Sequence, residues 1–329
     1  MKIGLTFDLK STYLEKGFTR DEVAEFDSEE TIEGIETALQ ELGHQTERIG
    51  NVTELAAALV KGQKWDLVFN ICEGMYGIGR EAQVPALLDA YRVPYTFSDP
   101  LVLSLTLHKG LTKRVIRDAG IATAPFFMIE TADQAQQCNL PFPVFIKPVA
   151  EGSGKGISNQ SVVKDLDAFR TESVKLLETY KQPVLVEKLL TGREFTVGIL
   201  GTGAKARVVG VMEVNISRDA EDQTYSRFIK ENYENRVQYS LVEGEVKELC
   251  AEISLNAWRA LGCRDACRID LKMDENGIPN FIEVNPLAGI NHLHSDLPIM
   301  LYKQGWRYVE LIDEIIRSAS ERIQKTVIQ

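Results

Sequence analysis

The first hundred residues alternate between short apolar runs and amphipathic stretches. Apolar residues at every second position indicate a first strand, at Ile3, Leu5 and Phe7. Apolar residues at helical spacing follow, at Ile32, Ile35, Leu39 and Leu42. Asp27 and Glu30 are placed like a capping box at the start of that helix. With an apolar strand at 67–71, a helix at 86–91 and a strand at 93–95, the pattern predicts a small open α/β sheet.

From about residue 105 the pattern changes to an α+β type, for which we expect antiparallel sheets. A helix is expected at 109–119, and Gly120 is placed as its C-cap. Further strands are expected at 126–128, 144–147, 184–187, 194–200, 207–214, 268–273 and 281–285. Long helices are expected at about 165–180, 244–261 and 306–324. The stretch 217–239 is polar and aperiodic, which predicts a mobile loop over a site.

Composition narrows the function classes. A chain of 329 residues is long enough for two or three packed domains. Its formal net charge of -11 argues against a nucleic-acid partner, because phosphate backbones attract basic surfaces. The sequence has no signal-peptide pattern and no apolar run near the ~18 residues that span a bilayer, so no membrane partner is expected. Five cysteines without framework spacing predict reduced thiols and a cytoplasmic protein rather than a disulfide or zinc site.

The strongest group of chemically useful residues lies on a predicted hairpin, whose turn is Asn276-Gly277. Strand alternation places three polar side chains on one face, those of Arg268, Asp270 and Lys272. On the partner strand Glu283 and Asn285 share a face, and Ile282 and Val284 share the opposite one. Asp270, Glu283 and Asn285 are therefore expected to converge, and three oxygen donors beside a polyphosphate suit Mg²⁺. The alternative is an ordinary solvated face of a sheet.

Two further segments fit a nucleotide site. At 146–156 a strand ends in Lys147 and leads into a glycine-rich loop that contains Ser153, and such loops let backbone N–H groups approach phosphate oxygens. It is not a Walker A loop, because Gly156 follows Lys155. At 184–190 an apolar strand ends in charged residues that could hold a flat base and ribose hydroxyls. A plain glycine-rich turn and ordinary strand-end charge are the respective alternatives.

Taken in this order, the three features resemble the ATP-grasp superfamily, specifically the D-alanine–D-alanine ligase family. The resemblance covers nearly the whole chain and includes the segments 66–70, 94–98, 107–113, 187–197, 268–270 and 283–286. It implies an ATP-grasp fold with an N-terminal open α/β domain, in which the first substrate is recognised, at 1–103. A central ATP-grasp subdomain at 104–186 and a C-terminal subdomain with the metal and nucleotide site at 187–329 would follow.

The resemblance also implies a role for each matching residue. Contacts to ATP are implied for Lys109, Lys147, Glu187, Lys188, Leu190 and Glu194. Two magnesium ions, for which Mn²⁺ can substitute, would be bound by Asp270, Glu283 and Asn285. Catalytic roles are implied for Arg268, Ser153, Lys230 and the backbone N–H of Gly289. Ser295 would place the carboxylate of the second substrate.

The implied activity is ATP-dependent joining of a carboxylate to an amine through an acyl phosphate, with small amino acids as substrates and a homodimer as the assembly. In this family the product is a dipeptide for peptidoglycan synthesis. The chain departs from the family pattern where the first substrate binds, because Glu73-Gly74 replaces a His-Gly pair. Two alternatives follow: a ligase that joins an amino acid to a different acceptor, as in mycosporine-like amino-acid synthesis, or a non-catalytic ATP-binding protein. Glu73, Tyr76 or Arg80 could contact such an acceptor, or could instead form surface ion pairs and a packed ring.

Overall fold

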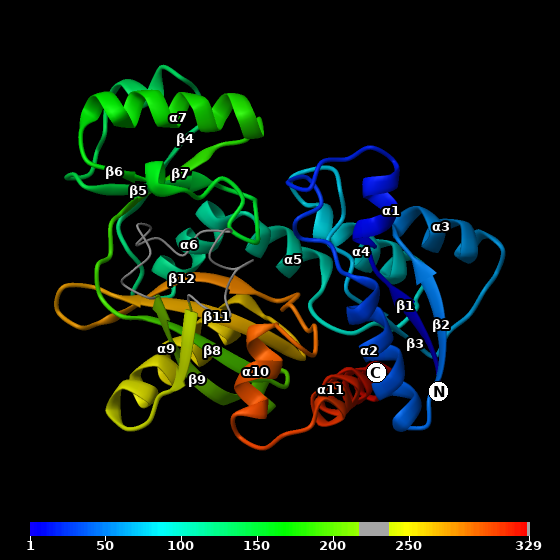
Figure 1. Ribbon diagram of the computed structural model, residues 1–329. Coiled ribbons are helices and arrows are strands. Elements are labelled where there is room, and N and C mark those ends of the chain that lie inside the picture. The colour runs from blue at the N-terminus through cyan, green and yellow to red at the C-terminus, as the bar shows by residue number, and fades with distance from the viewer. Residues whose placement is uncertain (217–236, 328–329) are drawn as a thin grey trace.

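The computed structural model of the protein describes residues 1–216 and 237–327 (Figure 1). Within these residues the strands form three sheets, ordered β2-β1-β3, β4-β7-β5-β6 and β10-β9-β8-β11-β12. Strands of the first sheet pair in parallel, and those of the other two pair antiparallel. The predicted combination of α/β and α+β parts is confirmed. No helix in these ranges has the length and apolar character to cross a membrane.

The first sheet is covered by helices on both faces. Its strands are β1 (Lys2–Thr6), β2 (Gln45–Gly50) and β3 (Leu67–Asn70), and its local helices are α1 (Lys10–Glu15), α2 (Glu29–Glu41), α3 (Val52–Val60) and α4 (Gln83–Ala90). All four residues of β3 are buried, as expected for a parallel strand between two helical layers. The strand predicted at 93–95 is reduced to one bridge, between Val68 and Tyr95.

Helix α2 begins one residue later than the predicted capping box requires. Ser28 is its N-cap, and the Ser28 hydroxyl accepts the backbone N–H of Thr31. Asp27 cannot take that position because its backbone pairs with the segment after β1, donating to Asp8 at 3.1 Å and accepting from Lys10 at 2.9 Å. The prediction that Asp27 caps this helix is therefore wrong.

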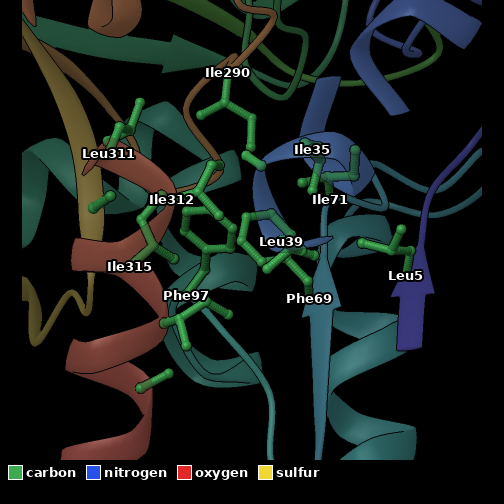
Figure 2. Close-up of a cluster of buried hydrophobic side chains, with 14 of the residues drawn as sticks. Leu5, Ile35, Leu39, Phe69, Ile71, Phe97, Ile290, Leu311, Ile312 and Ile315 are labelled. Atoms are coloured by element: carbon green, nitrogen blue, oxygen red, sulfur yellow. The ribbon is translucent and has the colours of Figure 1, made fainter. Parts of the chain in front are cut away.

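The last helix of the chain completes the core of the first sheet. Helix α11 (Tyr308–Val327) lies beside α2, and both pack on one face of the sheet (Figure 1). Figure 2 shows the resulting cluster, in which Ile312 and Ile315 of α11 meet Phe97 and residues of α2 and β3. Helices α3 and α4 cover the opposite face, where Val68 is buried.

The central part of the chain contains the second sheet. Its elements are α5 (Pro100–Leu107), α6 (Lys109–Asp118), β4 (Phe126–Ile129), β5 (Val144–Pro148), β6 (Val162–Val163), α7 (Leu166–Tyr180) and β7 (Val184–Lys188). Helix α7 packs on this sheet through Phe169. The predicted domain boundary between residues 186 and 187 falls inside β7, so the sheet ends slightly later than the prediction, and the division into domains stays a prediction.

The third sheet carries most of the predicted chemistry. Its elements are β8 (Glu194–Leu200), β9 (Arg207–Ile216), β10 (Val237–Leu241), α9 (Glu245–Leu261), β11 (Ala266–Met273), β12 (Pro279–Asn285) and α10 (Asp296–Tyr302). Since β10 begins at Val237, the last residues of the loop predicted at 217–239 form a strand instead. The rest of that loop, with Lys230, lies outside the described residues.

Candidate active site

Helix α6 presents two lysines on its buried face. Lys109 and Lys113 are one helical turn apart and therefore lie on the same side. Lys113 is fully buried, where its ammonium donates to the Thr123 hydroxyl at 2.6 Å and to the Phe281 carbonyl at 3.1 Å. Lys109 is 8% exposed, and its ammonium donates to the Glu151 carbonyl at 2.6 Å.

These lysines belong to a buried network of ion pairs that joins α6 to three strands. Glu187 on β7 receives Lys113 at 2.7 Å on one carboxylate oxygen and Lys147 of β5 at 3.3 Å on the other. Glu283 on β12 lies 3.7 Å from the Lys109 ammonium and 3.8 Å from that of Lys147. The second and third sheets therefore approach within ion-pair distance at the point where phosphate-binding lysines were predicted.

The lysines and glutamates of this network compensate one another's charges, and this affects their pKa values. Burial raises the pKa of Glu187, but Lys113 and Lys147 outweigh burial and hold that pKa below its usual value. Burial lowers the pKa of Lys147, and the carboxylates of Glu187 and Glu283 more than offset this. For Lys113 burial prevails over Glu187, so its pKa is lowered. Both lysines nonetheless gain charged partners in a site that excludes water.

The hairpin of β11 and β12 has the predicted arrangement at its polar face. Asp270 is paired across the strands with Glu283, and Arg268 with Asn285, while the Asn285 amide lies 3.3 Å from Asp270 Oδ2. The predicted convergence of Asp270, Glu283 and Asn285 is therefore confirmed. Ile282, however, falls at a register shift where Leu271 pairs with Phe281, so the bulge removes Ile282 from the regular alternation that was predicted.

Arg268 is held by two carboxylates. Its Nε and Nη2 atoms each lie 3.1 Å from an oxygen of Asp270, and its Nη1 lies 2.6 Å from Asp296 Oδ2. Asp296 is the first residue of α10 and is 8% exposed. Such a planar, two-sided arrangement fixes the orientation of the guanidinium group.

Many of the predicted residues line one cavity, whose volume is about 470 Å³. Eight of them line it: Glu73, Lys109, Ser153, Arg268, Glu283, Asn285, Gly289 and Ser295. Three sheets or their connecting loops thus contribute to a single concave site, the usual form of an enzyme's substrate site. The predicted residues that do not line it are Tyr76, Arg80, Lys147, Glu187, Lys188, Leu190, Glu194 and Asp270.

The glycine-rich loop after β5 reaches this cavity through Gly152 and Ser153. Ser153 and Gly154 both have left-handed backbones, with φ of 50° and 72°. A non-glycine residue in this region is strained, and such strain is retained where a loop must keep a particular shape. Lys155 stabilises the turn, because its ammonium lies 2.6 Å from Glu151.

Arg80 and Glu25 attach this loop to the N-terminal part of the chain. The Arg80 guanidinium lies 2.7 Å from Glu25 Oε2 and donates to the Ala150 carbonyl at 2.8 Å, and both side chains of the pair are less than a tenth exposed. Glu25 in turn accepts the backbone N–H of Gly152. Arg80 thus supports the loop rather than lining the cavity, and Tyr76 is 69% exposed. Of the residues predicted to contact an acceptor on this side, only Glu73 lines the cavity.

The residues predicted for adenine and ribose lie at the end of β7 and the start of β8. Lys188 pairs with Glu275 at 2.6 Å near the surface, and Glu194 pairs with Lys272 at 2.9 Å. Leu190 is buried, at 6% exposure. Lys272 therefore forms an ion pair with the carboxylate that was predicted to hold ribose.

The loop before α10 forms the remaining wall. The Ser295 hydroxyl accepts the backbone N–H of Asn291 at 3.0 Å, and a Cβ added at Gly289 would lie 3.0 Å from that hydroxyl oxygen. A side chain larger than hydrogen would therefore crowd Ser295. His294 lines the cavity, whereas the ring of His292 packs against Tyr308 with centroids 5.7 Å apart.

Sequence reasoning missed several residues of the site, namely Glu25, Glu81, Lys113 and Asp296. Lys113 had a readable signal, since it follows Lys109 by one helical turn. Glu25 and Glu81 come from segments with no periodic pattern, so only tertiary contacts reveal them. All five cysteines are free thiols, as predicted.

Comparison with known proteins gives consistent results for sequence and structure. A family model described as the C-terminal part of D-Ala–D-Ala ligase matches residues 115–317. An uncharacterised protein of Sinorhizobium fredii is 30% identical over 300 residues, which cover 88% of this chain and 87% of that protein. A D-alanine–D-alanine ligase of Aquifex aeolicus is 31% identical over 287 residues, with 87% and 93% covered.

A solved structure also has the same fold. The D-alanine–D-alanine ligase from Bacillus anthracis, in complex with ATP, superposes with a TM-score of 0.71 at 22% identity. The match covers 99% of each chain, so the similarity of fold includes the N-terminal sheet as well as the two antiparallel ones.

Proposed function

The chain belongs to the D-alanine–D-alanine ligase family and is an ATP-dependent, amide-forming ligase of that type, and we propose that its substrates react in the cavity lined by Lys109, Arg268 and Ser295. The observation that carries this proposal is that phosphate-binding, oxyanion-binding and carboxylate-binding candidates all line one cavity. A carboxylate does not react with an amine at neutral pH. We propose that a phosphoryl group from ATP first makes it an acyl phosphate, and that the amine then displaces phosphate.

Lys109, Lys147 and Ser153 would position the phosphates of ATP. Lys147 and Lys109 approach one another through Glu283, so their charges can face the same polyphosphate. The Glu187 carboxylate, 3.3 Å from the Lys147 ammonium, holds that ammonium in position. Glu187, Lys188 and Leu190 would also hold adenine, and Glu194 would hold ribose after its ion pair with Lys272 opens.

The hairpin residues fit a magnesium site. Asp270, Glu283 and Asn285 supply carboxylate and amide oxygens, the donors that Mg²⁺ prefers, from adjacent positions on two paired strands. When bound there, two magnesium or manganese ions would neutralise negative charge on the transferred phosphoryl group. The contact of Asp270 with Arg268 holds this carboxylate in position.

Arg268 and the N–H of Gly289 would stabilise the oxyanion that develops when the amine attacks. Ser295 is close enough to Gly289 to place the carboxylate of the second substrate beside that donor. Lys230, in the stretch between β9 and β10, would assist on the phosphate side. Exclusion of water from the cavity would protect the acyl phosphate from hydrolysis.

The substrate pair has two candidate identities. D-alanine for both substrates would give the peptidoglycan dipeptide. A different acid or acceptor is favoured by one observation, that Glu73 and Glu81 line the cavity where the chain departs from the family pattern. A homodimer and a cytoplasmic location complete the proposal, since ATP is abundant there and free thiols stay reduced.

The test is ADP release from ATP and Mg²⁺ by the full chain, with D-alanine and with a panel of other amino acids and acids. Release with D-alanine alone supports the dipeptide ligase, and release with another pair supports the second identity. Absence of acid-dependent ADP release with every pair would reject the ligase proposal.

A further inference from the structure

The wall of the cavity that comes from the N-terminal part of the chain is rich in carboxylates. Glu25, Glu73 and Glu81 line it, together with Lys10. They come from the segment before α2 and from the loop between β3 and α4. Arg268 of β11 and Ser295, the N-cap of α10, line the same cavity and suit an anionic group.

Charge compensation in this wall is incomplete. Glu25 is paired with Arg80 at 2.7 Å and accepts the N–H of Gly152. No hydrogen bond or ion pair within 1–216 and 237–327 reaches the carboxylate of Glu73 or of Glu81. Two carboxylates thus line the cavity without a hydrogen bond or ion pair among these residues, although Arg80 and Lys109 are near enough to offset part of their charge.

This arrangement is unfavourable unless a ligand completes it. Burial raises the pKa of Glu73 well above its usual range, and the nearby charge of Glu81 adds to the effect. Burial likewise raises the pKa of Glu81 to about 7, although Arg80 opposes the shift. Carboxyl groups whose pKa values are strongly raised in a cavity are typical of functional sites, and a cationic ligand would favour their ionised form.

The missing partner fits an organic cation better than a metal ion. Among the residues that the structure describes, no group of three or more His, Cys, Asp and Glu side chains is arranged to hold a metal. The same cavity also carries the positive charges of Arg268 and Lys109, so a substrate with both a carboxylate and further positive charge would find opposite charges for each within it.

We propose that the acid substrate carries two positively charged nitrogens, as a diamino or guanidino acid does, and that Glu73 and Glu81 bind them. The proposal rests on the proposed ligase function and specifies its substrate class. A single ammonium, as in alanine, would pair with one carboxylate and leave the other without an ion-pair partner. Glu73 and Glu81 are therefore residues that determine specificity rather than catalytic groups.

The experiment compares cationic and neutral acids of similar length. ADP release is measured with ornithine, lysine and arginine against norvaline and alanine, in both configurations and with each amino acid as second substrate. We expect kcat/KM for the best cationic acid to exceed that for norvaline by about 100-fold, because the site's polar groups stay unpaired with the neutral analogue. Equal use of norvaline and of the cationic acids would overturn the proposal.

Glu73→Gln and Glu81→Gln test the two carboxylates directly. Each should reduce the preference for the cationic acid about tenfold, and the double variant should remove it, while the KM for ATP stays within about twofold of that of the unchanged protein. Glu15→Gln, at the exposed end of α1, is the matched control and should change neither quantity. A preference that survives in the double variant rejects the assignment.

A binding measurement separates failure of this proposal from failure of the ligase function. Calorimetric titration of the full chain with ornithine and with norvaline, in the presence of ADP, needs no turnover. Ornithine binding that Glu73→Gln abolishes supports the cation site even if no pair of acids releases ADP. Absence of ornithine binding rejects the cation site even if D-alanine is a good substrate.

Discussion

The side of the cavity that we propose for ATP, the ATP side, and the N-terminal wall differ in how their buried charges are compensated. On the ATP side, Glu187 is shared by two lysines and Glu283 lies near two, so each carboxylate has a positive neighbour within 3.8 Å. On the N-terminal wall, only Glu25 has such a neighbour, and Glu73 and Glu81 have none among the described residues. The first region is complete without ligand, and the second is not.

We interpret this difference as one between ATP binding, which all members of the ligase family share, and substrate choice, which varies among members. The paired region is the one that we propose for ATP, whose shape is the same for every member, and its residues match the family pattern. The unpaired region is the one that we propose for the variable substrate, and its Glu73 departs from that pattern. Four substitutions test whether the two regions differ in the way that we describe.

Asp270→Asn should have the largest effect. The substitution preserves shape but removes a charge at the predicted metal site, so we expect turnover to fall about 1,000-fold, equivalent to roughly 4 kcal/mol. ADP release measures turnover, and a thermal melt should show an intact fold. Asp313→Asn, at an exposed position on α11, is the control. Unchanged turnover in Asp270→Asn would refute the metal assignment.

Lys113→Met tests the completeness of the ATP side. Removing one partner of a buried ion pair leaves the other charge poorly compensated, so we expect the free energy of unfolding to drop by about 3 kcal/mol. Lys175→Met removes an ion pair with Glu172 whose lysine is 63% exposed, and it should cost less than about 1 kcal/mol. Urea denaturation measures both. Similar losses in the two variants would mean that the buried network contributes little.

Glu25→Gln tests the one compensated carboxylate of the N-terminal wall. The variant weakens the attachment of Arg80 and Gly152, so the glycine-rich loop should position phosphate less well. We expect the KM for ATP to rise about tenfold, with a smaller change in kcat. Glu22→Gln, an exposed neighbour in the same segment, should leave both constants unchanged. A fall in kcat alone would indicate a role in chemistry instead of loop placement.

Glu81→Gln should give the smallest effect, and one that depends on pH. The folded protein raises the pKa of Glu81 from 4.5 to about 7, so it binds this proton more tightly than the unfolded chain does. Stability therefore falls as pH rises from about 4.5 to 7, where Glu81 ionises beside Glu73 and Glu25, with Arg80 and Lys109 only partly opposing. The neutral variant should be more stable by about 1 kcal/mol at pH 8 and equal at pH 4.

Thermal melts across this pH range check the last prediction, with Glu15→Gln as the exposed control. A variant that is less stable than the unchanged protein at pH 8 would show that Glu81 has a compensating partner after all.

Local patterns predicted much of the ATP side from sequence. Alternation fixes which residues of a strand share a face, so Asp270, Glu283 and Asn285 could be grouped correctly without coordinates. The bulge at Ile282 was missed because an extra residue in a strand leaves no mark in an alternating run. Lys113 was missed as a site residue because its partner Glu187 is distant in sequence.

The N-terminal wall was harder to predict for physical reasons. Strand β2 is at the edge of its sheet and half exposed, so it lacks the apolar run that identifies a strand. Arg80 was assigned to substrate because its partner Glu25 lies in an aperiodic segment. Ion pairs between residues that are distant in sequence leave no local pattern. Which residues line the N-terminal wall depends on such pairs, so the sequence alone does not reveal them.

The position of α11 affects how the protein is made. Residues 308–327 cover one face of a sheet built from the first hundred residues. A ribosome adds about 5–20 residues per second. Synthesis of the first hundred residues and synthesis of α11 are therefore separated by roughly 200 residues, or about 10–40 seconds. During that interval Leu5, Ile35 and Phe69 lack part of their apolar cover, and the nascent chain is a natural client for a chaperone until its last helix emerges.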